Sequence, residues 1–150
     1  MLYRHIEWPV IVLLGAMIPI GDALYNSGLT NILASAIATQ SIQFGLVGTL
    51  IILMVATMCL SDVINNAATA VIMGPISVTI ANQLGQPTEP FLMCVAIGAS
   101  CAFLSPIGHQ CNTLVMGPGN YKFGDYWKLG LPLELLIIAI STPLLLIFWF

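Results

Sequence analysis

Residues 46–84 decide the fold, and they read LVGTLIILMVATMCL, then SDVINN, then AATAVIMGPISVTIANQL. Two apolar runs are joined by a polar tip, residues 61–66, which contains no basic residue. The first run, 46–60, would rise roughly 22 Å as a helix, whereas the hydrocarbon core of a bilayer is ~30 Å thick. The pattern therefore predicts a pair of membrane helices over about 44–84. The pair is either a re-entrant hairpin or two full spans joined by a tight turn.

The composition of the whole chain indicates a membrane protein. Of its 150 residues, 59% are apolar and only 6% are charged, three of them basic and six acidic. A soluble domain carries about 25% charged residues, and so few charges could not cover its surface. The stretches without any charge are 23–61, 63–88, 90–121 and 135–150. The sequence predicts an all-α integral membrane protein, and with three basic residues it is not expected to bind nucleic acid.

A second polar interruption follows at residues 105–113, which read SPIGHQCNT. It separates the apolar stretch 91–104 from a short apolar piece at 114–116. Unwound backbone inside a membrane is tolerated only where it is buried in protein or lines a wet cavity. The pattern predicts a discontinuous transmembrane helix over about 91–120, and the apolar residues 131–150 predict a last span.

The segments that flank these elements are simpler. Residues 8–20 are apolar but are interrupted by glycine and proline. Residues 23–40 carry apolar side chains at helical spacing with polar residues between them, which predicts an amphipathic helix. Residues 85–90, GQPTEP, predict an exposed loop.

The two polar interruptions contain the elements of a transport site. A half-helix N-terminus offers N–H groups and a positive dipole end to an anion, and unwound carbonyl groups can coordinate Na⁺. Simpler interpretations stay open. Asn65 and Asn66 can form a turn, and Asp62 can cap a helix at the membrane interface. His109 can be a hydrogen-bonded structural residue instead of a proton carrier.

Catalytic signatures do not occur in the sequence. It contains no nucleophile–base motif, no zinc-protease motif and no glycine-rich phosphate loop. An enzyme is therefore not expected, and no cofactor is implied.

The motifs around both interruptions resemble those of the divalent anion/sodium symporters, the SLC13-type permeases with a citrate transporter-like domain. Residues 61–70, SDVINNAATA, resemble the tip of the second hairpin in that family, and residues 105–119 resemble the break in its next helix. Smaller matches follow at 75–76, 121–126 and 130–133. The resemblance covers the C-terminal half of such a permease.

The resemblance implies a single membrane domain over 1–150 that forms one repeat of an inverted-repeat transporter. The expected function is secondary active transport by sodium-coupled symport of a small divalent anion, such as sulfate or a dicarboxylate. Na⁺ is the expected coupling ion, with no other metal. The expected partners are the missing N-terminal half repeat, the lipid bilayer and a second copy of the full permease. The expected location is the cell (inner) membrane, with several passes.

The resemblance also implies roles for single residues. The expected substrate-binding residues are Asn65, Asn66, Ala67, His109 and Asn112. The expected sodium-binding residues are Ser61, Asn66, Gly108 and Gln110, with Ser61 and Gly108 providing backbone carbonyls. The family tip has Ser-Asn-Thr where this chain has Asn-Asn-Ala, so both hydroxyl donors are replaced. A compact oxyanion such as sulfate can bind through backbone N–H groups alone.

Two other functions stay open at this point. The chain could be an inert truncated product or an assembly subunit with no transport activity of its own. It could also be a proton-coupled or arsenite-type carrier of the wider ion transporter superfamily. An upstream reading frame that encodes a second hairpin motif would favour the permease half over the inert subunit, and a counter-ion exchange in an uptake assay would identify a proton-coupled carrier.

Overall fold

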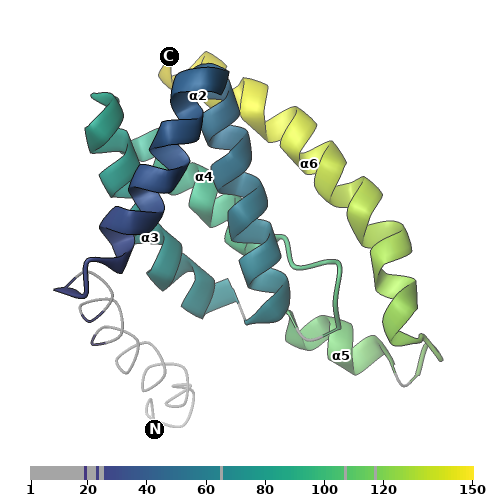
Figure 1. Cartoon of the computed structure of the whole chain (residues 1–150). Helices are drawn as coiled ribbons and strands as arrows, with labels where there is room; N and C mark the ends of the chain where they lie inside the picture. The colour runs from purple at the N-terminus through teal and green to yellow at the C-terminus, as the bar shows by residue number, and fades with distance from the viewer. Residues whose placement is uncertain (1–18, 20–22, 24–25, 65, 107, 117) are drawn as a thin grey trace, which may run out of the picture.

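The computed structural model describes residues 19, 23, 26–64, 66–106, 108–116 and 118–150. These residues form α2 (Leu29–Val63), α3 (Asn66–Leu84), α4 (Glu89–Ser100), α5 (Gln110–Met116), the 3-10 helix η2 (Phe123–Asp125) and α6 (Tyr126–Trp149). No strand occurs among them, and Figure 1 shows a bundle of helices joined by loops. The prediction of an all-helical chain is therefore confirmed for the described residues.

Three helical segments in the described part are long and apolar enough to cross a membrane, namely Gly45–Val63, Asn66–Leu84 and Phe123–Trp149. The first two have 19 residues each, and a helix of that length rises about 28 Å. The first is longer than the apolar run 46–60 because the polar residues Ser61 and Asp62 continue the helix. α4 is apolar but has only 12 residues.

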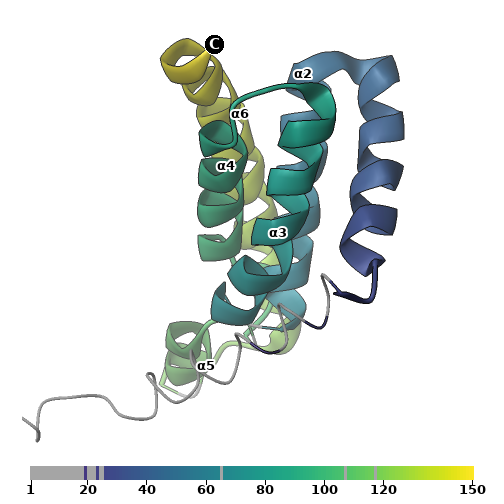
Figure 2. The same ribbon diagram turned by 90° about the vertical axis from the view of Figure 1, so that its left-hand side faces the viewer.

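α2 consists of two helices that meet at Gly45. This residue has φ 68° and ψ −172°, in a region of backbone space that favours glycine because it lacks a Cβ. No other atom lies within 4 Å of the position that a Cβ would take, so the conformation and not the available space requires glycine. Figure 2 shows the chain reversing here, so that residues 29–44 run beside the second half of α2. The helix predicted over 23–40 begins at Leu29 in the structure.

The core lies where the second half of α2, α3 and α4 pack against one another (Figure 1). The largest fully buried apolar side chains are Phe91, Leu50, Leu53, Met54, Met58, Ile76 and Ile80. Gly98 allows α4 to approach α2 closely, because a Cβ there would lie 3.0 Å from Thr57 Cβ and 3.2 Å from the Met54 carbonyl oxygen. Small residues at such contacts are typical of helix packing in membranes.

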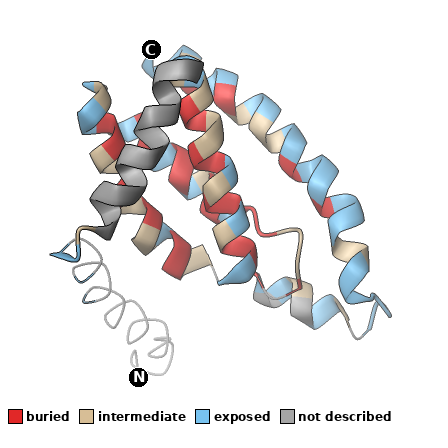
Figure 3. Ribbon diagram, viewed as in Figure 1, coloured by how far each residue is buried: buried red, intermediate tan, exposed pale blue. Residues whose placement is uncertain are grey.

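α6 covers one side of α2 and α4, and most of its residues stay exposed (Figure 3). It begins at Tyr126, earlier than the span expected at 131–150, and it continues through Pro132 and Pro143. Its first turn is held by Asp125. This carboxylate accepts a hydrogen bond from the Lys122 N–H at 3.0 Å and forms a salt bridge with Lys128 at 2.9 Å.

The contact between α4 and α2 at Gly98 predicts a selective loss of stability. Gly98→Val would force the added methyl groups into Thr57, and overpacking of this kind costs about 1–3 kcal/mol. We therefore expect a lower melting temperature for the purified protein in detergent, followed by circular dichroism. Gly74→Val is the matched control, because no other atom lies within 4 Å of a Cβ at Gly74. Equal melting temperatures for the two variants would contradict this packing.

Candidate functional site

The candidate site lies where the hairpin tip meets the unwound segment between α4 and α5. The described residues between α4 and α5, 101–106 and 108–109, are not helical. Figure 1 places the tip between α2 and α3 at the same end of the bundle as α5. The backbone of the unwound segment needs hydrogen-bond partners, because an unpaired polar group is costly wherever water is excluded.

Asp62, at the end of α2, supplies one of these partners and also binds a side chain of the segment. Its side chain is only 7% exposed, and its Oδ1 accepts a hydrogen bond from the Leu104 N–H at 3.0 Å. Its backbone oxygen accepts a hydrogen bond from the Ser105 hydroxyl at 2.6 Å. The sequence allowed two interpretations of Asp62, as a helix cap or as a functional acid. In the structure it binds the unwound segment between α4 and α5, which is called the break below.

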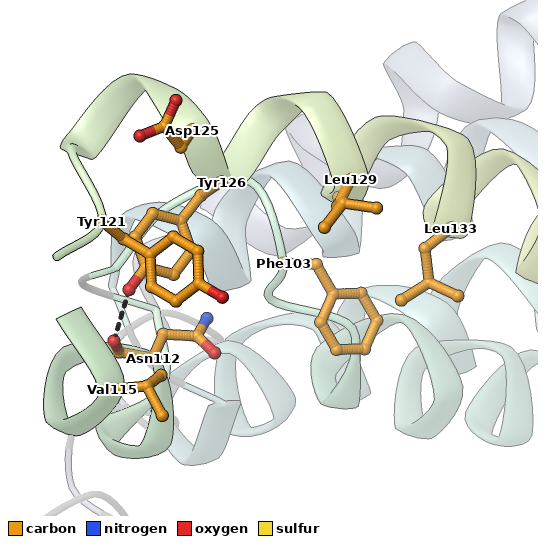
Figure 4. Close-up of a pocket in the computed structure, with 9 residues that line it drawn as sticks. Phe103, Asn112, Val115, Tyr121, Asp125, Tyr126, Leu129 and Leu133 are labelled. Atoms are coloured by element: carbon orange, nitrogen blue, oxygen red, sulfur yellow. Dashed lines mark hydrogen bonds between the residues drawn. The ribbon is translucent and has the colours of Figure 1, made fainter. Parts of the chain in front are cut away.

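Asn112 holds the break from the side of α5. Its Nδ2 donates hydrogen bonds to the Ala102 oxygen at 2.8 Å and to the Ser105 oxygen at 3.1 Å. An amide nitrogen has two protons, so both are engaged within the protein. The Tyr126 hydroxyl donates a hydrogen bond to the Asn112 backbone oxygen at 2.6 Å, as Figure 4 shows. Asn112, which is expected to contact substrate, therefore also fixes the shape of the break.

Three of the four expected sodium-binding residues come together at the tip. The Ser61 hydroxyl lies 2.7 Å from the Ala99 backbone oxygen and 2.9 Å from Asn66 Oδ1. A hydroxyl has one proton, so it donates to only one of these two oxygens at a time, and the shorter contact is with Ala99. Asn66 Oδ1 is then left as an acceptor that a cation can use. Gln110, the fourth residue, is the first residue of α5, and its side chain lies outside the described part.

Gly108 brings the break against the tip. A Cβ on this buried residue would lie 2.8 Å from the Ser61 carbonyl oxygen, 2.7 Å from Ala102 Cβ and 3.1 Å from Asp62 Cα. No side chain fits at these distances, so glycine is required for the close approach. Ser61 and Gly108, which were both expected to present carbonyls to sodium, are therefore in contact although they are far apart in the sequence.

The expected substrate-binding residues are placed as follows. Asn65 lies outside the described residues. Ala67 is half-buried in the first turn of α3. His109 is exposed beside the start of α5, and its Nδ1 accepts a hydrogen bond from the Cys111 N–H at 3.2 Å. This bond agrees with the simpler interpretation of His109 as a structural residue.

A cavity of about 200 Å³ lies between α5 and α6, and Figure 4 shows its lining. The lining residues are Phe103, Asn112, Val115, Tyr121, Asp125, Tyr126, Leu129, Gly130 and Leu133. Among them Asn112 is the only expected site residue. The lining is mainly apolar and carries one acidic side chain, which does not suit a divalent anion.

Sequence reasoning missed two residues of α6 that meet the break. A Cβ on Gly130 would collide with the Phe103 backbone oxygen, so glycine lets α6 lie directly on the unwound segment. Glu134 is only 8% exposed and lines, together with Leu104 of the unwound segment, a cavity of about 170 Å³ between α2 and α6. A signal was present in the sequence, because Glu134 is the one acid within the last span and acids inside membrane helices are costly.

Comparisons with known proteins identify the family of this chain. The family model described as CitMHS, citrate transporter, matches residues 2–150. A transporter of Synechocystis sp., named as uncharacterized, is 41% identical over 144 residues, which are 96% of this chain and 23% of the relative. A second transporter named as uncharacterized, from Escherichia coli, is 36% identical over 143 residues, which are 95% of this chain and 23% of the relative.

A sodium/sulfate cotransporter of Chlamydomonas reinhardtii is 27% identical over 139 residues, which are 92% of this chain and 16% of the relative. The chain thus spans less than a quarter of the length of these relatives. Their names point to a transporter and not to an enzyme, and the three helices able to cross a membrane indicate an integral membrane protein. Because the family model matches nearly the whole chain, the protein belongs to the citrate transporter family, which confirms the resemblance of its tip and break motifs to that group of permeases.

Proposed function

We propose that this chain is one repeat of a secondary active transporter that couples Na⁺ to the symport of a small divalent anion such as sulfate. In this proposal the second half of α2 and α3 form a re-entrant hairpin, and α4 and α5 form a discontinuous transmembrane helix. An N-terminal half repeat completes the transport unit. The full permease is a homodimer with several passes through the cell (inner) membrane.

The contact between the tip and the break is the observation that carries the proposal. It brings the Ser61 carbonyl oxygen against Gly108 and the Asn66 amide oxygen next to the Ser61 hydroxyl. Neutral oxygens from unwound backbone and helix ends are the groups that hold Na⁺ in transporters of this kind. The carboxylate of Asp62 follows Ser61 directly and favours a cation nearby through its charge.

The start of α3 supports an anion beside this cation site. The helix begins at Asn66, so the positive end of its dipole lies at the tip. In this proposal Asn65, Asn66 and Ala67 present backbone and amide groups to the anion, and His109 and Asn112 complete its surroundings. The absence of hydroxyl groups from residues 65–67 favours a compact oxyanion over a dicarboxylate.

Asn66→Ala tests the shared role of this residue. Hydrogen bonds and contacts to charged groups contribute about 1.5–3 kcal/mol, so we expect Na⁺-dependent uptake to fall about ten- to a hundredfold. The assay follows labelled sulfate and labelled succinate in vesicles that contain the complete permease with this chain. Asn82→Ala is the matched control, because Asn82 is an exposed asparagine near the opposite end of α3. Uptake that is unchanged by Asn66→Ala, for both anions, would refute the site.

Gly108→Ala tests the cation site independently of transport. The added methyl group would push the break away from the Ser61 carbonyl, so the affinity for Na⁺ should fall. A ligand that binds the folded state raises its stability, so NaCl should raise the melting temperature of the native protein above its value in choline chloride. We expect this rise to be lost in Gly108→Ala. It should persist in Gly124→Ala, because no other atom lies within 4 Å of a Cβ at Gly124. A rise of the same size in both variants would place the cation elsewhere.

A further inference from the structure

Glu134 in α6 is a buried acid that has no basic partner in the described part of the chain. Its side chain is only 8% exposed, whereas the salt bridge found among the described residues is the exposed one between Lys128 and Asp125. The Oε1 atom of Glu134 is fully buried, and no N–H or O–H group of the described residues donates to it. A buried carboxylate oxygen without a donor is costly. Glu134 is therefore suited to a donor that comes from outside the described residues.

The cavity of about 170 Å³ between α2 and α6 provides room for such a donor beside Glu134. The other lining residues are Val55, Met58, Cys59, Leu104, Leu131, Leu135 and Ile138. Apart from the thiol of Cys59, these side chains are apolar. An apolar cavity of about 150 Å³ holds a benzene molecule, so this cavity has room for an aromatic ring with a short substituent.

The charges around the cavity favour a cation. Glu134 is the one charged residue among the described residues of the lining. A second acid lies close, because Asp62 accepts a hydrogen bond at 3.0 Å from the N–H of Leu104, which is part of the lining. The terminal bond of a glutamate side chain turns easily, so Oε1 can face a donor in the cavity. Negative charge in an apolar site attracts a positively charged group and repels an anion.

The cavity can be reached from the outside of the bundle. Val55, Cys59, Leu131 and Leu135 border it and are exposed on the surface of α2 and α6. Both helices are long and apolar enough in this part of the chain to cross a membrane. An amphiphilic molecule dissolved in the bilayer can therefore reach the cavity without passing the hairpin tip.

We propose that the cavity between α2 and α6 is a binding site for a small amphiphilic amine. The ammonium group donates a hydrogen bond to the Glu134 carboxylate, and the apolar body of the molecule fills the space between the two helices. None of the expected substrate-binding or sodium-binding residues lines this cavity, so the site is separate from the candidate transport site. The bound amine contacts Leu104 and thereby supports the break from the side of α6.

The native cysteines report on the occupancy of the cavity without any transport assay. Cys59 is exposed and lines the cavity, Cys111 is exposed in α5, and Cys94 and Cys101 are buried. The probe is phenethylamine, because an aliphatic amine is positively charged at pH 7. Mass spectrometry follows the reaction of each cysteine with methyl methanethiosulfonate, an uncharged reagent, in the complete protein in lipid vesicles. We expect saturating phenethylamine to slow the labelling of Cys59 about tenfold and to leave the rate of Cys111 unchanged.

Two molecules of similar size separate the charge of the amine from its apolar body. Propylbenzene is uncharged and phenylacetate is an anion. We expect propylbenzene to protect Cys59 only at a concentration at least about tenfold higher than phenethylamine, because it makes no charge-assisted hydrogen bond. Phenylacetate should give no protection, because the carboxylate of Glu134 repels it.

Variants of α6 test the two parts of the site. Glu134→Gln keeps the size of the side chain but removes its charge, so half-protection by phenethylamine should need about tenfold more amine, while propylbenzene should act as before. Glu89→Gln, on an exposed acid, is the matched control. Leu135→Trp fills the cavity and should abolish protection by both molecules, whereas Leu136→Trp lies outside the lining and should not. An unchanged labelling rate of Cys111 shows that each variant keeps its fold.

Three results would overturn the proposal. The first is a labelling rate of Cys59 that saturating phenethylamine leaves unchanged, as expected if another part of the permease fills the cavity. The second is equal protection by phenethylamine, propylbenzene and phenylacetate, which would mean that the acid takes no part in binding. The third is protection by phenethylamine that is as strong in Glu134→Gln as in the native protein.

Discussion

The structure depends on one constraint, which is that the unwound segment at 101–109 must find hydrogen-bond partners inside an apolar bundle. Each buried polar group left unpaired would cost several kcal/mol in a membrane. Asp62 and Asn112 meet this need from opposite sides, one at the end of α2 and one in α5. The polar residues that look like a transport site in the sequence are therefore also the residues that make the break possible.

Two glycines allow the unwound segment to pack closely against its neighbours. Because Gly108 lacks a Cβ, the unwound segment can contact the Ser61 carbonyl, and for the same reason Gly130 lets α6 contact the Phe103 carbonyl. The unwound segment is thus held between the hairpin tip and α6.

The elements that sequence reasoning predicted well are those set by local pattern. The loop at 85–90 agrees with the end of α3 at Leu84 and the start of α4 at Glu89, because glycine and proline disfavour helix within a few residues. The family was also recognisable, because its motifs are contiguous stretches. The reversal at Gly45 was missed, since a glycine inside an apolar run has the same appearance whether the helix continues or turns.

Long-range partners could not be predicted from one sequence. Spacing along the chain does not reveal that Asp62 accepts a hydrogen bond from the Leu104 N–H or that Gly130 of α6 lies against the Phe103 backbone oxygen. The length of α6 was also underestimated, because the polar residues 121–128 suggested a loop. In the structure Asp125 contacts Lys122 and Lys128, and the helix begins at Tyr126. The substrate-binding and sodium-binding roles of all the expected site residues stay predictions, and the side chains of Asn65 and Gln110 lie outside the described part of the chain.

The contact between the hairpin tip and the unwound segment is best tested by hydrogen exchange of the backbone amides of residues 101–109, measured on the complete protein in lipid vesicles. The account predicts slow exchange in this segment although it is not helical, further slowing when NaCl replaces choline chloride, and fast exchange in Asp62→Ala. Fast exchange in the native protein, or exchange rates that are the same with Na⁺ and with choline, would contradict it.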